Sequence, residues 1–224
     1  MSNFSLGLGE ALQQYLLDVS LREPAVCRRL REQTLLMPEA KMLSSPEQVQ
    51  LLLLMLKLLD AASGLEVGTF TGYTSLRLTL GIPELRMTCC DISEEFTAIA
   101  RAHWREAGVA ERIELRLAPA LETLDALVAN GKSATFDFAY VDADKTAYRE
   151  YVERCLTLVR PGGLIAIDNT LWSGSVADPE NHEADTLALR RFNSWLYAQE
   201  EHEYDLSLVP IGDGLTLLRK GLPA

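Results

Sequence analysis

Two apolar segments of this chain end in side chains whose oxygen atoms suit a hard metal ion. Residues 136–142 end at Asp142, and residues 164–168 end at Asp168, with Asn169 directly after it. Two carboxylates and an amide oxygen favour Mg²⁺, with Ca²⁺ and Mn²⁺ as alternatives. Adjacent residues face opposite sides of a regular strand, so Asp168 and Asn169 can converge only where the strand turns off. Without a cation the carboxylates would repel each other, and the pKa of at least one should rise. Helix capping by Asp142 is a second interpretation, although capping does not account for the second strand's Asp-Asn pair.

Three further residues near these strand ends are candidates for chemistry. Lys145 lies three residues after Asp142, and a lysine beside a metal-bound hydroxyl can act as a general base if its pKa is lowered. A surface lysine paired with Asp144 is the alternative. Trp172 follows the metal pair and either forms a wall for a flat substrate or belongs to the core. Asn193 lies beside the core face of a later helix, where it is either a substrate contact or an exposed polar residue.

A glycine-containing segment follows an earlier apolar run. Gly68 and Gly72 have the spacing G-x-x-x-G, which allows the backbone to approach a ligand or simply forms a turn. This spacing is not the G-x-G-x-x-G dinucleotide fingerprint. Glu66 would repel a phosphate but suits a cationic ligand. Asp91 ends the next apolar run, where an acid commonly holds ribose hydroxyls; helix capping by Asp91 or Ser93 is the alternative.

The elements around these residues predict a doubly wound α/β fold. Short apolar runs alternate with amphipathic segments after residue 63, which is typical of a parallel sheet covered by helices on both faces. Ligands bind outside the carboxyl ends of the strands in such sheets, and all the candidate metal ligands lie there. We expect strands at 65–68, 87–91, 113–117, 136–142 and 164–168, with helices at 74–80, 94–107, 121–130 and 147–159.

The two ends of the chain have different patterns, within what we predict to be a single domain spanning 1–224. Residues 1–62 are predicted to form a helical cap, and residues 63–224 the α/β core. The cap helices are expected at 8–19, 24–37 and 45–59. The C-terminal part should contain a helix at 185–198 and an antiparallel hairpin with strands at 206–210 and 215–219. The resulting sheet has seven strands and is mainly parallel.

Composition indicates which classes of partner and which cellular compartment suit this chain. The chain has 224 residues, with 21 Lys and Arg against 32 Asp and Glu, so its net charge of −11 disfavours nucleic acid and anionic membranes as partners. No apolar run is long enough to span a bilayer, and the N-terminus does not have the pattern of a signal peptide. The four cysteines lack metal-site spacing, which favours buried thiols and a cytoplasmic location. His103 is expected to pack, and His182 and His202 to be solvated.

Four stretches of this sequence resemble the cation-dependent, S-adenosylmethionine-dependent O-methyltransferases of the caffeoyl-CoA and catechol O-methyltransferase group. The resemblance extends from about residue 42 to residue 219, and the second and third stretches together are highly specific. The stretches are Glu66-Val-Gly-Thr-Phe-Thr-Gly-Tyr-Thr-Ser, Val141-Asp-Ala-Asp-Lys, Gly163-Leu-Ile-Ala-Ile-Asp-Asn-Thr-Leu-Trp and Pro210-Ile-Gly-Asp-Gly-Leu-Thr.

The resemblance implies a function and a role for each candidate residue. It implies transfer of a methyl group from S-adenosylmethionine to a hydroxyl of a catechol-like small molecule, in a homodimer with a bound divalent cation. Asp142, Asp168 and Asn169 would bind the cation, with Lys145 as the base. Asp142 would also contact the donor's amino group. The other donor-site residues would be Met42, Ser44, Glu66, Gly68, Phe70, Thr74, Asp91 and Ala120.

The sequence also departs from the family pattern, and other classes of function compete with this one. Val49 replaces a small residue in the donor-side helix, Asp144 stands where catechol O-methyltransferase has a tryptophan, and the polar loop at 172–185 matches neither group. The acceptor therefore does not follow from the resemblance. The alternatives are a NAD-dependent oxidoreductase on a similar fold, a non-catalytic S-adenosylmethionine-binding protein, and a methyltransferase acting on nucleic acid or protein.

Overall fold

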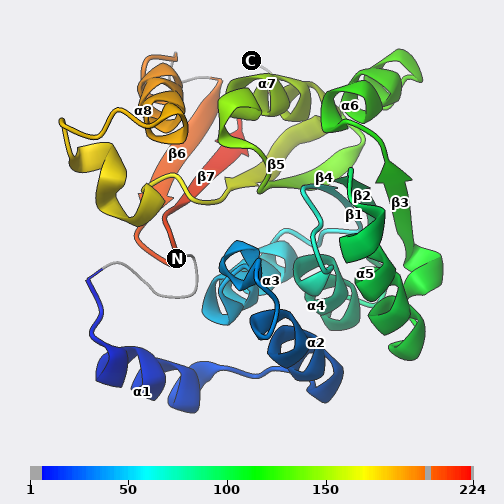
Figure 1. The fold of residues 1–224 in the computed structure, drawn as a ribbon. Coiled ribbons are helices and arrows are strands. Elements are labelled where there is room, and N and C mark those ends of the chain that lie inside the picture. The colour runs from blue at the N-terminus through cyan, green and yellow to red at the C-terminus, as the bar shows by residue number, and fades with distance from the viewer. Residues whose placement is uncertain (1–6, 200–202, 223–224) are drawn as a thin grey trace.

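Seven strands form one mainly parallel sheet in the computed structural model, which describes residues 7–199 and 203–222 (Figure 1). The strand order is β3-β2-β1-β4-β5-β7-β6. β1 to β5 pair in parallel, whereas β7 is antiparallel to both β5 and β6. This topology confirms the predicted fold class. The strands are β1 (Ser63–Val67), β2 (Arg86–Asp91), β3 (Ile113–Leu117), β4 (Phe136–Val141), β5 (Val159–Ile167), β6 (Tyr204–Val209) and β7 (Leu215–Lys220).

Helices cover both faces of the sheet, as Figure 1 shows. Successive residues of a strand point to opposite faces, and the central strands carry apolar side chains on both faces. In β4, Phe138 packs on one face with α2, α3, α4 and α5, and Val141 packs on the other with α6, α7 and α8. The helices are α1 (Glu10–Ser20), α2 (Ala25–Leu35), α3 (Pro46–Leu58), α4 (Tyr73–Gly81), α5 (Glu94–Glu106), α6 (Ala120–Ala129), α7 (Tyr148–Leu158) and α8 (Ala184–Tyr197). Short 3₁₀ helices are η1 (Ala40–Met42), η2 (Ala110–Arg112), η3 (Lys145–Ala147) and η4 (Trp172–Ala177).

The N-terminal helices are joined to the α/β core by a partly buried ionic contact. Arg31 of α2 donates two hydrogen bonds to the Glu23 carboxylate, each 2.9 Å long. The Tyr73 hydroxyl, at the start of α4, donates to the same carboxylate over 2.6 Å. A charged acceptor shared by two elements makes strong hydrogen bonds, so this contact ties the helical cap to the segment that follows β1.

Some predicted element boundaries and contacts differ from the observed ones. β5 begins at Val159, five residues before the predicted start, because that residue already pairs with Phe136. β3 is one of the two edge strands and is largely exposed. Helices therefore do not cover both of its faces, as would be expected for a continuous apolar run. Ser45 precedes α3 as predicted, but its side chain makes no capping hydrogen bond. No helix within the described residues is long and apolar enough to cross a membrane.

Asp137 fixes the register between β1 and β4. Its carboxylate accepts hydrogen bonds from the backbone N–H groups of Ala62 and Ser63, at 2.9 and 2.8 Å, and from the Arg160 guanidinium at 2.7 Å. Although partial burial raises the pKa of Asp137, these donors outweigh it and leave that pKa below its ordinary value. The register in turn aligns Val67 with Val141, so the ends of both strands meet at one edge.

Replacing Asp137 should therefore destabilise the fold. We expect Asp137→Ala to lower the free energy of unfolding by about 1–3 kcal/mol, because several donors lose a charged acceptor. Urea denaturation measures this change. Asp125→Ala is the matched control, since Asp125 pairs with Arg154 on the surface and should contribute less than about 1 kcal/mol. Equal losses in both variants would contradict a role for Asp137 in the register.

Candidate active site

A cavity of about 840 Å³ opens at the carboxyl ends of the parallel strands. Its walls come from the β1–α4, β2–α5, β3–α6 and β4–α7 connections, from η1 and from η4. Every residue predicted to bind the methyl donor lines it: Met42, Ser44, Glu66, Gly68, Phe70, Thr74, Asp91, Ala120 and Asp142. Lys145, Asn169 and Trp172 line it too. Asp168 lies fully buried behind them.

The segment after β1 wraps closely around the neighbouring strand ends. Gly68 has a φ of +89°, and a Cβ there would lie 1.9 Å from the carbonyl oxygen of Asp142. Only glycine permits this approach. The Asp91 carboxylate accepts from the N–H groups of Thr69 and Phe70, at 2.9 and 2.7 Å. Asp91 therefore shapes the loop. Of the two residues predicted as alternatives for a helix cap, Ser93 is the one that caps α5, since its hydroxyl accepts a hydrogen bond from the Phe96 N–H.

Glu66 presents a buried carboxyl group to the cavity. Only 1 % of the residue is exposed, and its Oε2 atom has no hydrogen-bond partner among the described residues. Burial, with a smaller contribution from the charge of Asp91, raises the pKa of Glu66 to about 8. A buried polar atom without a partner is costly, so this oxygen is well suited to accept a hydrogen bond from a ligand.

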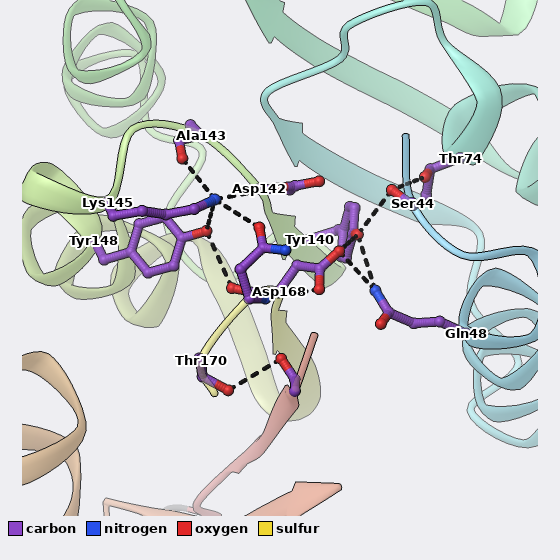
Figure 2. A network of polar contacts seen from close by, with 12 residues as sticks. Ser44, Gln48, Thr74, Tyr140, Asp142, Ala143, Lys145, Tyr148, Asp168 and Thr170 are labelled. Carbon is purple, nitrogen blue, oxygen red and sulfur yellow. Dashed lines mark hydrogen bonds and ion pairs between the residues drawn. The ribbon is translucent and has the colours of Figure 1, made fainter. Parts of the chain in front are cut away.

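Oxygen atoms from the ends of β4 and β5 converge on a cation, the Lys145 ammonium group. It donates to Asp142 Oδ1 at 3.2 Å and to the Ala143 carbonyl at 2.9 Å, as Figure 2 shows. It also donates to Asn169 Oδ1 at 2.6 Å. The Tyr148 hydroxyl completes this shell at 2.6 Å. Lys145 is 9 % exposed, so it is a buried residue, and the alternative of a surface lysine paired with Asp144 is wrong.

Asn169 reaches this position because the chain leaves β5 with a left-handed residue. Its φ is +60°, a conformation that asparagine tolerates better than most residues. The turn lets Asn169 approach Lys145 while the preceding Asp168 faces another group of residues. The strand turns off after Asp168 as predicted, but Asp168 and Asn169 do not contact one common group: Asn169 shares the Lys145 cation with Asp142, whereas Asp168 contacts Gln48 and Tyr140.

The Asp168 carboxylate is held by two residues that the sequence analysis did not assign to the site. Its Oδ2 atom accepts from the Tyr140 hydroxyl at 2.6 Å and from the Gln48 amide at 2.7 Å (Figure 2). Burial first, and the charge of Asp142 second, raise the pKa of Asp168 to about 7. This is the direction expected for two carboxylates without a metal between them. Ser44, one of the predicted methyl-donor residues, extends this hydrogen-bond network, since its hydroxyl lies 3.1 Å from that of Tyr140.

The two predicted substrate residues differ in position. Trp172 lines the cavity, with its ring centre 5.6 Å from the Lys145 ammonium. Asn193 of α8 is not among the cavity-lining residues; its amide donates to the Thr170 carbonyl at 2.8 Å and supports the chain after β5. Asp213, which the sequence places in the fourth family-like stretch but which was given no role in the site, does line the cavity.

The described histidines and the cysteines are not part of the candidate site. His103 donates from Nδ1 to the Ile99 carbonyl within α5, over 3.1 Å, and His182 is exposed. His202 lies outside the described residues. All four cysteines are buried free thiols. No group of three or more His, Cys, Asp or Glu side chains in residues 7–199 and 203–222 has metal-binding geometry; the predicted set contains only two carboxylates, with an amide as its third member.

The family model for O-methyltransferases matches residues 17–221. This chain belongs to the O-methyltransferase family. It is 42 % identical over 210 residues to the mouse catechol O-methyltransferase domain-containing protein 1, covering 93 % of this chain and 79 % of that protein. It is 39 % identical to a caffeoyl-CoA O-methyltransferase of Eucalyptus gunnii, over 96 % of this chain and 90 % of the relative.

Solved O-methyltransferases have the same fold. TomG from Streptomyces achromogenes, solved in complex with SAM, superimposes with a TM-score of 0.83 and 29 % identity, over 95 % of this chain and 96 % of TomG. The Bacillus cereus O-methyltransferase, solved with SAH, gives a TM-score of 0.81 and 29 % identity, over 94 % and 97 % of the two chains. These comparisons confirm the predicted family, and they give no support to a NAD-dependent oxidoreductase.

The buried carboxyl group of this O-methyltransferase predicts a pH-dependent stability. Glu66 has an ordinary pKa of 4.5 and a folded-state pKa of about 8. In that pH window the folded protein keeps a proton that the unfolded chain releases, so the free energy of unfolding falls as pH rises. Glu66→Gln removes this titration. We expect the variant to gain more than about 1 kcal/mol relative to wild type between pH 5 and pH 8.

Chemical denaturation of both proteins at several pH values measures this gain. All other groups titrate in both proteins, so the difference between the two curves isolates Glu66. Glu122→Gln, on the surface of α6, is the matched control and should show no such difference. A Glu66→Gln curve parallel to that of wild type would mean that Glu66 is already ionised in the folded protein.

Proposed function

We propose that this O-methyltransferase transfers a methyl group from S-adenosylmethionine to a hydroxyl of a catechol-like small molecule, with a divalent cation. The observation that carries the proposal is the convergence of oxygens from Asp142, Ala143 and Asn169 on one positive charge. It lies in the same cavity as the residues expected to hold the donor.

The donor side of the cavity fits a cationic nucleoside-like ligand. The unpartnered Oε2 of Glu66 can accept a hydrogen bond from such a ligand. Gly68 allows the ligand to approach the backbone, and Asp91 lies at the end of β2, where acids bind ribose hydroxyls. The relatives solved with SAM and SAH support the same assignment. We infer that the predicted donor residues, including Met42 and Ser44, surround the donor.

The residues at the ends of β4 and β5 fit a hard dication. Their carboxylate and amide oxygens already surround an ammonium group, and oxygen ligands of this kind suit Mg²⁺. We propose Asp142, Asp168 and Asn169 as its ligands. When bound, the dication would lower the pKa of the acceptor hydroxyl and fix its orientation.

Lys145 is suited to take the proton of the acceptor hydroxyl once its ammonium group has released a proton to solvent and become a neutral amine. Its Nζ atom is buried among Asp142, Asn169 and Tyr148. A general base must lie within hydrogen-bond reach of the proton that it removes, and Lys145 lines the same cavity as Asp142 and Asn169. Attack by an oxyanion on a sulfonium methyl neutralises charge, so a site with little water favours the reaction.

The charge of the cavity favours an acceptor without phosphate groups. Carboxylates outnumber cations along its walls even without the protonated Glu66, with Asp91, Asp142, Asp144, Asp185 and Asp213 against Lys41 and Lys145. This balance suits a cationic donor and a dication but repels a polyphosphate. We therefore propose a small catechol, with Trp172 as an aromatic wall, in preference to a hydroxycinnamoyl-CoA thioester.

We also propose that the chain works as a cytoplasmic homodimer with α1 in the interface. Leu12, Tyr15 and Val19 are 55 %, 63 % and 63 % exposed, and their spacing places them on one face of α1. Figure 1 shows this helix at the periphery of the molecule.

Tyr15→Glu should convert a dimer to a monomer in sedimentation equilibrium, with Arg149→Glu as a surface control. A wild-type monomer would contradict the proposal.

Removing divalent cations should abolish methyl transfer. We expect the purified protein to methylate a catechol in the presence of S-adenosylmethionine and Mg²⁺, and to lose this activity in excess EDTA, because the hydroxyl loses its activating charge. A panel of catechol, a single phenol and a hydroxycinnamoyl-CoA thioester tests the acceptor class. Full activity in EDTA would contradict the metal role, and donor binding without any turnover would favour the non-catalytic binding protein.

Lys145→Met should lower kcat by about 10²–10⁴-fold, the usual contribution of a general base. The affinity for the donor, measured by calorimetry with S-adenosylhomocysteine, should change little because the donor residues remain. Lys132→Met is the control, since Lys132 is an exposed lysine outside the cavity. If Lys145→Met kept the wild-type kcat, Lys145 would have only a structural role.

A further inference from the structure

Three successive residues after β5 adopt a left-handed backbone. The φ angles are +48° for Trp172, +51° for Ser173 and +86° for Gly174. Residues with a Cβ rarely adopt this conformation, because the side chain approaches the following carbonyl. Two such residues in a row persist only where surrounding contacts hold them. The turn also decides the position of Trp172, whose ring lies 5.6 Å from the Lys145 ammonium.

The contacts that hold this turn come from the connection between β6 and β7. The Asp213 carboxylate accepts hydrogen bonds from both the backbone N–H and the hydroxyl of Ser173. The Asp213 carbonyl accepts from the Leu171 N–H at 3.0 Å. Asp213 is 3 % exposed and lines the cavity. Its carboxylate therefore interacts with groups inside the protein and little with bulk solvent.

The neighbouring glycine makes this docking possible. Gly214 has a φ of +89°, and a Cβ there would lie 2.5 Å from the Leu171 nitrogen. Its carbonyl accepts from the N–H and the hydroxyl of Thr170, at 3.0 and 3.1 Å. Two backbone segments are thus joined along residues 170–173, and the Asp213 side chain is the acceptor that reaches the centre of the left-handed turn.

We propose that Asp213 is a positioning residue for the methyl acceptor: its carboxylate holds the left-handed turn at 172–174 and so fixes Trp172 beside Lys145. This inference rests on the proposed function, because it assigns Trp172 and Lys145 to the acceptor side of the cavity. Asp213 need not touch the acceptor. Its effect passes through the turn, and small displacements of positioning groups have large effects on rate.

Two measurements on Asp213→Ala test the proposal. The first is ¹⁹F NMR of protein labelled with fluorotryptophan, in which the chain's three tryptophans are assigned with Trp172→Phe. We expect the Trp172 resonance alone to shift or broaden. The second is steady-state kinetics with a catechol, where we expect the acceptor KM to rise and kcat to fall, at least about tenfold together. The donor Kd should remain within about twofold of wild type, because donor contacts lie on other elements.

Matched variants separate positioning from loss of charge or fold. Asp205→Asn removes an equal charge from an exposed residue of the same hairpin, where it pairs with Arg219, and should match wild type in both measurements. Asp213→Asn keeps an amide oxygen as a weaker hydrogen-bond acceptor, so it should change the Trp172 resonance and the acceptor kinetics less than Asp213→Ala does. It replaces Asp213→Ala in both measurements if that variant does not fold. Adding Ser173→Gly to Asp213→Ala should restore part of the acceptor KM, because glycine adopts the left-handed turn without a support.

Several outcomes would overturn the proposal. One is an unchanged Trp172 resonance together with unchanged acceptor kinetics in Asp213→Ala. Another is an equal loss of donor and acceptor affinity, which would indicate general damage to the cavity. The NMR measurement needs no turnover, so it decides the role of Asp213 in the turn even if no catechol proves to be a substrate.

Discussion

A positive charge must lie between the carboxyl ends of β4 and β5, and the rest of the site is arranged around it. Asp142 and Asp168 follow adjacent strands, and burial first and the charge of Asp142 second raise the pKa of Asp168. The Lys145 ammonium group supplies the charge here through contacts with Asp142 and Asn169. A cluster of oxygens that requires a cation for stability is also a cluster that can bind one for catalysis.

The same constraint explains why buried polar groups surround the rim. Asp168 is fully buried, and a carboxylate there needs donors on the side that faces away from the cation. Tyr140 and Gln48 provide them from β4 and α3. Because Ser44 contacts Tyr140 and Thr74, one network extends from the candidate metal ligands to the segment over the donor pocket. Such supporting partners orient the groups that bind a metal.

Sequence reasoning predicted most of the fold because the local patterns were consistent. Alternating runs identified the parallel core, and oxygen-bearing residues at strand ends identified the cavity edge. Tyr140 and Gln48 were missed since their partner lies 28 and 120 residues away, and a tyrosine in an apolar strand or a glutamine in a leucine-rich helix looks like ordinary packing. The surface alternative for Lys145 arose for a related reason: a lysine beside an aspartate has the pattern of an exposed ion pair.

Asp213 shows most clearly what topology adds to a local pattern. Within Gly212-Asp213-Gly214 it has the composition of an exposed hairpin turn. However, β7 inserts antiparallel between β5 and β6, and its register aligns Thr216 with Ile167. The start of β7 therefore lies at the carboxyl end of β5, where the parallel strands also end. A strand that reverses direction thus brings its preceding turn to the functional edge of the sheet, and the hairpin becomes part of the wall of the cavity.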